Sequence, residues 1–149
     1  MGNYADAADV AEKLKFAGIT IDDSSDPTDT EVEDYIASYE AEIDGVLRAQ
    51  GYPTIPASGT KDVNMLKQKV AMKVAAVVWM EKNSRGELSD RIKRYLEDYG
   101  MFINRLRRGE QWLANQSPLG EEDGQFLIVR TPTRDRVFTE RGGYTDWDE

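Results

Sequence analysis

The sequence predicts a mainly α protein, a small four-helix bundle with an extended C-terminal tail. Two observations predict this fold class. Between residues 6 and 113, apolar residues recur at steps of three and four positions, which is the spacing of one helix face. Glycines, prolines and capping residues divide this stretch into four segments. The helical pattern then stops, so we place a bundle domain at 1–114 and the extended tail at 115–149.

The first predicted helix is short. Asp6 is its N-cap and Gly18 is its C-terminal stop. Its apolar face carries Ala7, Val10, Ala11, Leu14 and Ala17. A helix of this length is stable only when it packs against other elements.

The second predicted helix has a longer apolar pattern. It opens either at Asp26-Pro27 or at the capping box of residues 30–33, Thr-Glu-Val-Glu. Its apolar face carries Val32, Tyr35, Ile36, Tyr39, Ile43, Val46 and Leu47. Gly51 and Pro53 close it, because closely spaced prolines do not continue a helix.

The third predicted helix, over about 61–82, is the candidate centre of the bundle. Between Val70 and Met80 its only charged residue is Lys73. A helix that is apolar on nearly all sides is usually buried. Trp79, with apolar neighbours at helical spacing, is therefore a predicted core residue.

The fourth predicted helix, over about 88–113, has basic residues mostly away from its apolar face. The apolar positions are Leu88, Ile92, Tyr95, Leu96, Tyr99, Phe102, Ile103, Leu106 and Leu113. Gly100 and Gly109 are each about 1 kcal/mol less favourable than alanine inside a helix, so we expect a bend near one of them. Trp112 is predicted to lie in the core.

The tail has a different pattern. Residues 126–130 and 136–141 are predicted strands, which would form a β-hairpin or add a strand to another sheet. An isolated hairpin is marginally stable, so its apolar residues need a surface of their own. The acidic end beyond them carries Tyr144 and Trp147, and Trp147 is a candidate anchor on a partner.

The composition excludes most enzyme chemistry. The 149 residues include no cysteine and no histidine, and the formal charge is −9. Disulfides, thiolate zinc sites and the Ser-His-Asp triad are therefore excluded, and the commonest general base is missing. We assign no catalytic residue, no metal and no cofactor. The N-terminus has no signal-peptide pattern, and the longest apolar run, 74–80, is shorter than the roughly 18 residues of a membrane span, so we expect a soluble cytosolic protein without membrane contact.

One acidic loop resembles a calcium site. Asp22, Ser24, Asp26 and Glu33 have the oxygen-ligand spacing of a calcium-binding loop, but the position that needs glycine is Pro27. We interpret the loop as a cap of the second helix, whose dipole favours acidic residues at its start.

Two further kinds of site find no support. No glycine-rich nucleotide-binding pattern occurs. Carboxylate pairs such as Glu40 with Asp44, or Glu97 with Asp98, are interpreted as solvated acids rather than a general acid and base.

The charge is distributed unevenly along the chain. Residues 1–60 hold 13 acidic and 3 basic residues, 61–114 hold 7 and 12, and 115–149 hold 8 and 4. The basic part includes four candidate contact residues, Arg94, Arg105, Arg107 and Arg108. They would either pair with acidic residues of this chain or a neighbouring copy, or contact DNA phosphates. Net negative charge favours the pairing.

Four stretches, taken together, resemble a known family. They are 4–10, 29–44 with its run Asp-Thr-Glu-Val-Glu-Asp-Tyr-Ile, the Gly-Tyr-Pro exit at 51–53 and the small-residue helix at 69–78. In this order they resemble head-to-tail adaptor proteins of long-tailed bacteriophages, the connector or head-completion proteins beneath the portal. The likeness covers about residues 4–114.

The resemblance implies a dodecameric ring of helical subunits on the portal. The ring would extend the DNA channel, pass DNA without sequence-specific binding and present a platform for a neck or tail-completion protein. It would form in the host cytoplasm and belong to the virion. In such adaptors a C-terminal segment reaches the portal, and the expected docking residues are Phe126, Leu127, Ile128, Val129, Val137, Phe138, Tyr144 and Trp147. The alternative is a DNA-binding packaging or regulatory protein that uses the basic face of the fourth helix.

Overall fold

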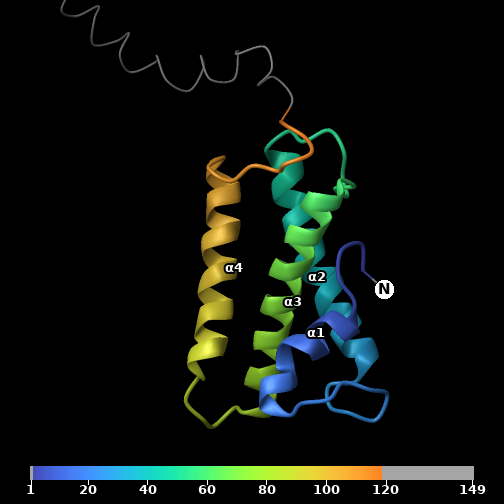
Figure 1. Cartoon of the computed structure of the whole chain (residues 1–149), viewed down its shortest axis with the longest axis vertical. Coiled ribbons are helices and arrows are strands. Elements are labelled where there is room, and N and C mark those ends of the chain that lie inside the picture. Colours follow the sequence, from blue (N-terminus) through green and yellow to red (C-terminus); the bar gives the residue numbers. More distant parts are fainter. Residues whose placement is uncertain (1, 119–149) are drawn as a thin grey trace, which may run out of the picture.

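The computed structural model describes residues 2–118, which form four α-helices (Figure 1). In chain order these are α1 (Ala7–Leu14), α2 (Asp29–Ala49), α3 (Thr60–Lys82) and α4 (Asp90–Arg108), with a 3-10 turn, η1 (Lys15–Ala17), after α1. The predicted mainly α four-helix fold is confirmed. Both predicted strands, and all eight expected portal-docking residues, lie outside the described residues.

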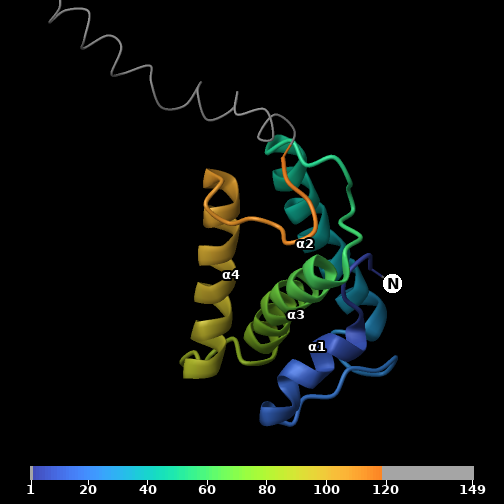
Figure 2. The ribbon, with the colours of Figure 1, turned by 45° about the horizontal axis from the view of Figure 1, so that its top comes forward.

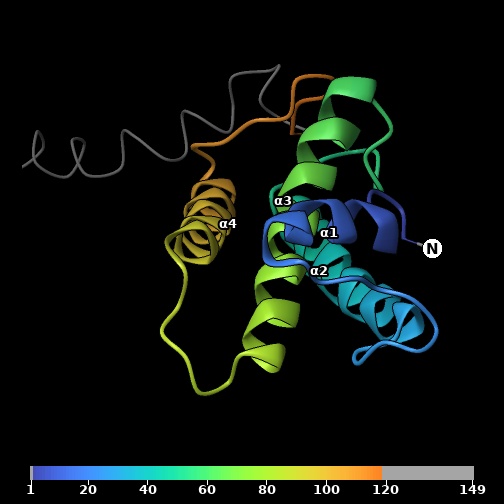
Figure 3. The same cartoon turned by 60° about the horizontal axis from the view of Figure 1, so that its bottom comes forward.

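Helix α3 is the centre of the bundle, as its sequence predicts. It runs in the opposite direction to α2 and α4 and packs against α1, α2 and α4 (Figure 1). Val70, Val74 and Val78 are fully buried along it. Figures 2 and 3 show α4 on one side of α3, and α1 and α2 on the other. The two sides of the bundle therefore share one core along α3.

The first helix begins where its sequence predicts, but its α-helical part ends at Leu14 and a 3-10 turn continues to the predicted stop at Gly18, leaving Ala17 exposed. The side chain of Asp6 accepts a hydrogen bond from the backbone N–H of Asp9, and the side chain of Asp9 accepts one from the N–H of Asp6. Gly18 ends η1 in the left-handed conformation, with a φ of 67°. Glycine adopts this conformation without the strain that a Cβ would add.

The start of α2 differs from both predicted alternatives. Thr28 is the N-cap, and it forms a capping box with Glu31 rather than the expected box of residues 30–33. The backbone N–H of Thr28 donates to Glu31 Oε2 at 2.8 Å. Thr28 itself has an extended backbone, so the helix begins at Asp29. At the other end α2 stops at Ala49, close to the predicted closure.

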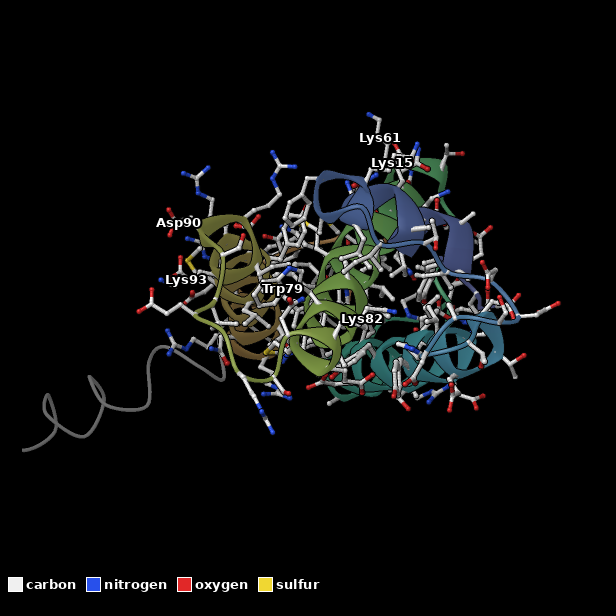
Figure 4. The ribbon with its side chains drawn as sticks, turned by 90° about the horizontal axis from the view of Figure 1, so that it is seen from below. Lys15, Lys61, Trp79, Lys82, Asp90 and Lys93 are labelled. Atoms are coloured by element: carbon white, nitrogen blue, oxygen red, sulfur yellow. The ribbon has the colours of Figure 1, made fainter. Side chains whose placement is uncertain are left out.

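Helix α4 ends earlier than its apolar pattern suggests. Gly109 has a φ of 73° and terminates the helix, so the predicted continuation to residue 113 is wrong. Leu113 is still buried, but from the irregular segment that follows. Trp112 is 44% exposed, which contradicts its predicted core position. Trp79 is buried as predicted and lies between α3 and α4 (Figure 4).

Candidate functional site

Three carboxylates are buried in the bundle, and each accepts hydrogen bonds from another part of the chain. Glu40 is 2% exposed, Asp44 6% and Asp62 1%. A buried charge is costly unless it is paired or hydrogen-bonded. The partners of each group therefore determine whether it is available for chemistry.

Glu40 holds the N-terminal segment against α2. Its carboxylate accepts hydrogen bonds from three consecutive backbone N–H groups, those of Asn3 at 2.5 Å, Tyr4 at 2.8 Å and Ala5 at 2.9 Å. These bonds use the lone pairs that a general base would need. The interpretation of Glu40 as a solvated acid is wrong, because its position on α2 faces the core between Ile36 and Ile43.

Asp44 also holds the N-terminal segment against α2, through the side chain of Tyr4. The Tyr4 hydroxyl donates to Asp44 Oδ1 at 2.5 Å and accepts from the backbone N–H of Ala57 at 2.9 Å. Burial raises the pKa of the Asp44 carboxyl, while the hydrogen bond from Tyr4 acts in the opposite direction. Burial, followed by the hydrogen bond to Asp44, raises the pKa of the Tyr4 hydroxyl. Asp44 is therefore not the solvated acid that its sequence context suggests.

The third buried carboxylate fixes the segment that follows α4. Asp62, in the first turn of α3, accepts hydrogen bonds from the backbone N–H groups of Ala114 at 2.5 Å and Asn115 at 2.9 Å. The Gln116 side chain bonds both the N–H and the carbonyl of Thr54, at 3.1 and 3.0 Å. The last described residues are thus bound to the end of the bundle where α2 ends and α3 begins (Figure 1).

The acidic loop does not assemble a calcium site. Asp22 Oδ1 accepts two hydrogen bonds from Ser24, and the Asp22 carbonyl accepts one from the N–H of Asp29, the first residue of α2. Glu33, the residue at the twelfth position, instead accepts a hydrogen bond from the backbone N–H of Ala7 at 2.8 Å. Within residues 2–118, no group of three or more acidic side chains is arranged to hold a metal ion. The interpretation of the loop as a cap of α2 agrees with these contacts.

The second carboxylate pair lies on the surface of α4. Glu97 and Asp98 are both exposed, as expected of solvated acids. Asp98 Oδ2 lies 3.9 Å from Lys69 Nζ, so α3 supplies a loose ion-pair partner.

The structure separates the four candidate arginines into two groups. Arg107 Nη2 binds Glu42 Oε1 at 2.9 Å, and Glu42 also accepts a hydrogen bond from Tyr99 at 2.8 Å. Arg107 thus pairs with a residue of the acidic first part of the same chain. Arg94, Arg105 and Arg108 are exposed, and none of them forms an ion pair with another residue of the described part.

The unpaired arginines share one face of α4. We call this face the α4 stripe, and it consists of Arg94, Asp98, Met101, Arg105 and Arg108. Their spacing of four, three, four and three residues places them in one line along the helix. Arg107 lies on a different side because each residue turns the helix by about 100°. Met101, in the middle of the stripe, is 51% exposed.

A hollow of about 300 Å³ lies beside the stripe, between α3 and α4. It is lined by Met65, Lys69, Asp98, Met101, Phe102, Arg105 and Gln111. Its lining mixes apolar side chains with the charged Lys69, Asp98 and Arg105, and Lys69 Nζ lies 5.8 Å from the centre of the Phe102 ring. Sequence reasoning missed this hollow because it depends on the packing of α3 against α4. The available signal in the sequence was the spacing of three and four residues between the stripe positions on α4. This spacing predicts the stripe but not the hollow beside it.

The start of α4 carries a charged pair on its outer side. Figure 4 shows Asp90 and Lys93 on the side of α4 away from α3, and their side chains approach to 3.8 Å. Among the described helices, none is both long and apolar enough to cross a membrane.

Comparison with protein-family models, curated protein sequences and solved structures gives no significant match for this chain.

Proposed function

We propose that this protein is a structural head-to-tail adaptor of a tailed bacteriophage. It assembles as a ring beneath the portal, extends the DNA channel and carries the neck or tail-completion protein. Three of the stretches that carry the resemblance lie in elements that pack together, since Tyr4 bonds Asp44, Ala7 bonds Glu33, and α3 packs against both α1 and α2. The resemblance therefore concerns one packed unit rather than scattered segments.

The observation that carries the proposal is the anchored exit of the chain at Pro118. Asp62 and Thr54 bind the preceding residues, and Pro118 is itself buried. The apolar run 126–129 follows only eight residues later. A docking segment that starts from a fixed point can reach a partner beyond that end of the bundle without loosening the helices.

The expected strength of one docking segment is modest. Burial of Phe126, Leu127, Ile128 and Val129 contributes roughly 6–12 kcal/mol, at about 1.5–3 kcal/mol for each side chain. Association costs about 4–15 kcal/mol before any net affinity remains. In a ring, later contacts become effectively intramolecular, so many weak segments hold firmly together. The proposal thus includes weak self-association without the portal and strong assembly on it.

The direct experiment mixes the purified full chain with its cognate portal. Native mass spectrometry and light scattering should give a saturable complex of one ring on another. Failure of the folded full chain to bind the portal at any ratio would reject the adaptor function.

A matched pair of tail variants tests the docking residues. Phe126→Asp with Leu127→Asp should abolish portal binding while the helical circular dichroism stays unchanged. Thr131→Asp with Thr133→Asp introduces the same charge between the predicted strands and should leave binding intact. If the first pair still binds as the wild type does, segment 126–129 is not the docking element.

The second candidate function is DNA binding through the α4 stripe. It is favoured by the three exposed arginines that have no carboxylate partner among the residues described. Binding to duplex DNA would then weaken with salt, with a slope of about −0.9 for each phosphate contacted. Arg105→Ala with Arg108→Ala should reduce this slope by about two, while Arg107→Ala, on another side of α4, should not. An unchanged slope in the first variant would reject this function.

A further inference from the structure

The hollow beside the α4 stripe has the chemistry of a peptide-docking surface. Met65, Met101 and Phe102 supply its apolar lining, and Met101 is 51% exposed to solvent. Arg105 also lines it, and Arg108 lies one turn further along the stripe. Protein interfaces usually combine apolar contacts with polar and charged groups. The occupant that fits best therefore combines apolar side chains with carboxylates.

This chain contains such a segment a few residues after Pro118 in the sequence. Residues 121–129 have the sequence Glu-Glu-Asp-Gly-Gln-Phe-Leu-Ile-Val, an acidic run followed by an apolar run. The acidic run complements the arginines, and the apolar run complements the methionines and Phe102. A nucleic acid would match the arginines but would leave the exposed Met101 without an apolar partner.

The length of the chain beyond Pro118 allows the contact within one molecule. Eleven residues, 119–129, span up to about 36–40 Å when extended. The 19 residues of α4 are about 28 Å long. Because a short tether gives an effective concentration in the millimolar range, the segment of the same chain has an advantage over that of a second copy.

We propose that the hollow and the α4 stripe dock residues 121–129 of the same chain in the free subunit. The carboxylates of the acidic run lie against Arg105 and Arg108, and the apolar run covers Met101 and enters the hollow. The contact shields the apolar run until a partner with a larger complementary surface takes it. The regulatory role of this contact concerns portal docking, and it therefore rests on the proposed function. The contact itself is tested without a portal, so a negative result for the contact can be distinguished from a failure of the adaptor function.

The test uses methyl NMR on the full chain labelled with 13C at the methionine methyl groups. The chain has no cysteine, so a Gly124→Cys variant accepts a single spin label between the acidic and apolar runs. The methyl signals of Met65 and Met101 should broaden strongly. Met80 serves as the internal reference, since it lies fifteen residues, or about 22 Å, further along α3 than Met65.

Charge variants show whether the arginines hold the segment. Arg105→Glu with Arg108→Glu should restore the two broadened signals, and added salt should act in the same direction. Lys82→Glu with Arg85→Glu is the matched control, because it makes the same charge change at two exposed positions, the last residue of α3 and a residue three positions further on. The control should leave the broadening unchanged.

Three outcomes would overturn the proposal. The first is that the spin label leaves the Met65 and Met101 signals unchanged. The second is broadening that depends on a spin-labelled second copy in a mixed sample, which would place a neighbouring chain in the hollow. The third is no effect of the label together with a shift of the Met101 signal on adding duplex DNA, which would assign the surface to nucleic acid.

Discussion

Glu40 shows how a single acidic residue can organise a chain terminus. Its carboxylate receives three consecutive backbone N–H groups just before α1. Charged hydrogen bonds of this kind are stronger than neutral ones, and a buried N–H left without a partner is costly. Glu40 therefore links the start of the chain to the middle of α2.

We predict that Glu40→Gln lowers the free energy of unfolding by about 1.5–3 kcal/mol. The amide keeps one acceptor oxygen but turns a donor group toward N–H groups that cannot accept. Urea denaturation followed by circular dichroism measures the change. Glu87→Gln, at an exposed position, is the control and should stay within about 0.5 kcal/mol of the wild type.

Asp44 makes the stability depend on pH. Burial raises the pKa of its carboxyl in the folded protein, so the folded state holds this proton more tightly than the unfolded chain. The resulting stabilisation is complete below the ordinary carboxyl pKa of about 4 and is lost as the pH rises through the raised value. Asp44→Asn cannot ionise and keeps an acceptor for the Tyr4 hydroxyl.

We therefore expect the difference in unfolding free energy, Asp44→Asn minus wild type, to increase between about pH 4 and pH 7, because only the wild type loses stability as Asp44 ionises. Urea titrations at several pH values in this range measure it. A difference between the two proteins that does not change with pH would contradict the assigned role of Asp44.

At the scale of elements, glycines decide how α4 ends. Gly109 stops the helix in the left-handed conformation, whereas Gly100 lies inside it with no atom within 4 Å of the position that a Cβ would take. The sequence marks both glycines as candidates for a bend. The sequence does not show which of the two ends the helix. That depends on the segment after Gly109, which turns back and bonds Asp62 of α3.

These two glycines should respond in opposite ways to the same change. Gly109→Ala is expected to cost about 1–2 kcal/mol because of the positive φ. Gly100→Ala is expected to stabilise the protein by about 0.5–1 kcal/mol, since alanine restricts the unfolded chain and fits the helix. Thermal unfolding of both variants measures the difference. Equal effects on the melting temperature would mean that α4 continues beyond residue 109.

The helix caps show where sequence patterns are sufficient. Asp6 and Gly18 were predictable because a capping box and a left-handed glycine depend on neighbouring residues only. The cap of α2 was missed by two residues because two overlapping Thr-x-x-Glu patterns, starting at Thr28 and Thr30, compete. The structure uses Thr28, and the N–H of the next residue, Asp29, donates to the carbonyl of Asp22, a contact that neither pattern contains.

At the scale of the whole molecule, the core is organised around α3. Leu66 is fully buried on this helix. Leu66→Ala should lower the free energy of unfolding by about 2–5 kcal/mol through lost burial and the remaining cavity. Because α3 packs against the other three helices, circular dichroism and tryptophan fluorescence should give coincident unfolding curves. Separate transitions would show that part of the bundle is stable without α3.

The fold was more predictable than the site for a physical reason. Helices and their buried faces follow from periodicity, which local sequence contains. The buried carboxylates follow the same periodicity, since Glu40 continues the steps of Ile36, Ile43 and Leu47, and this signal was available. The hollow between α3 and α4, and the exposure of Trp112, arise from contacts between distant segments. The expected tail contacts lie beyond the described residues.

The anchored exit at Pro118 also has a mechanical consequence. A force applied to the chain beyond it first meets the hydrogen bonds of Asp62 to residues 114 and 115 and those between Gln116 and Thr54. Several bonds that share a force must break nearly together, whereas the turns of a helix end can unwind one after another. These bonds therefore protect the C-terminal end of α4 from tension on the tail. Substitution of Asp62 would expose that end of the helix to the tension.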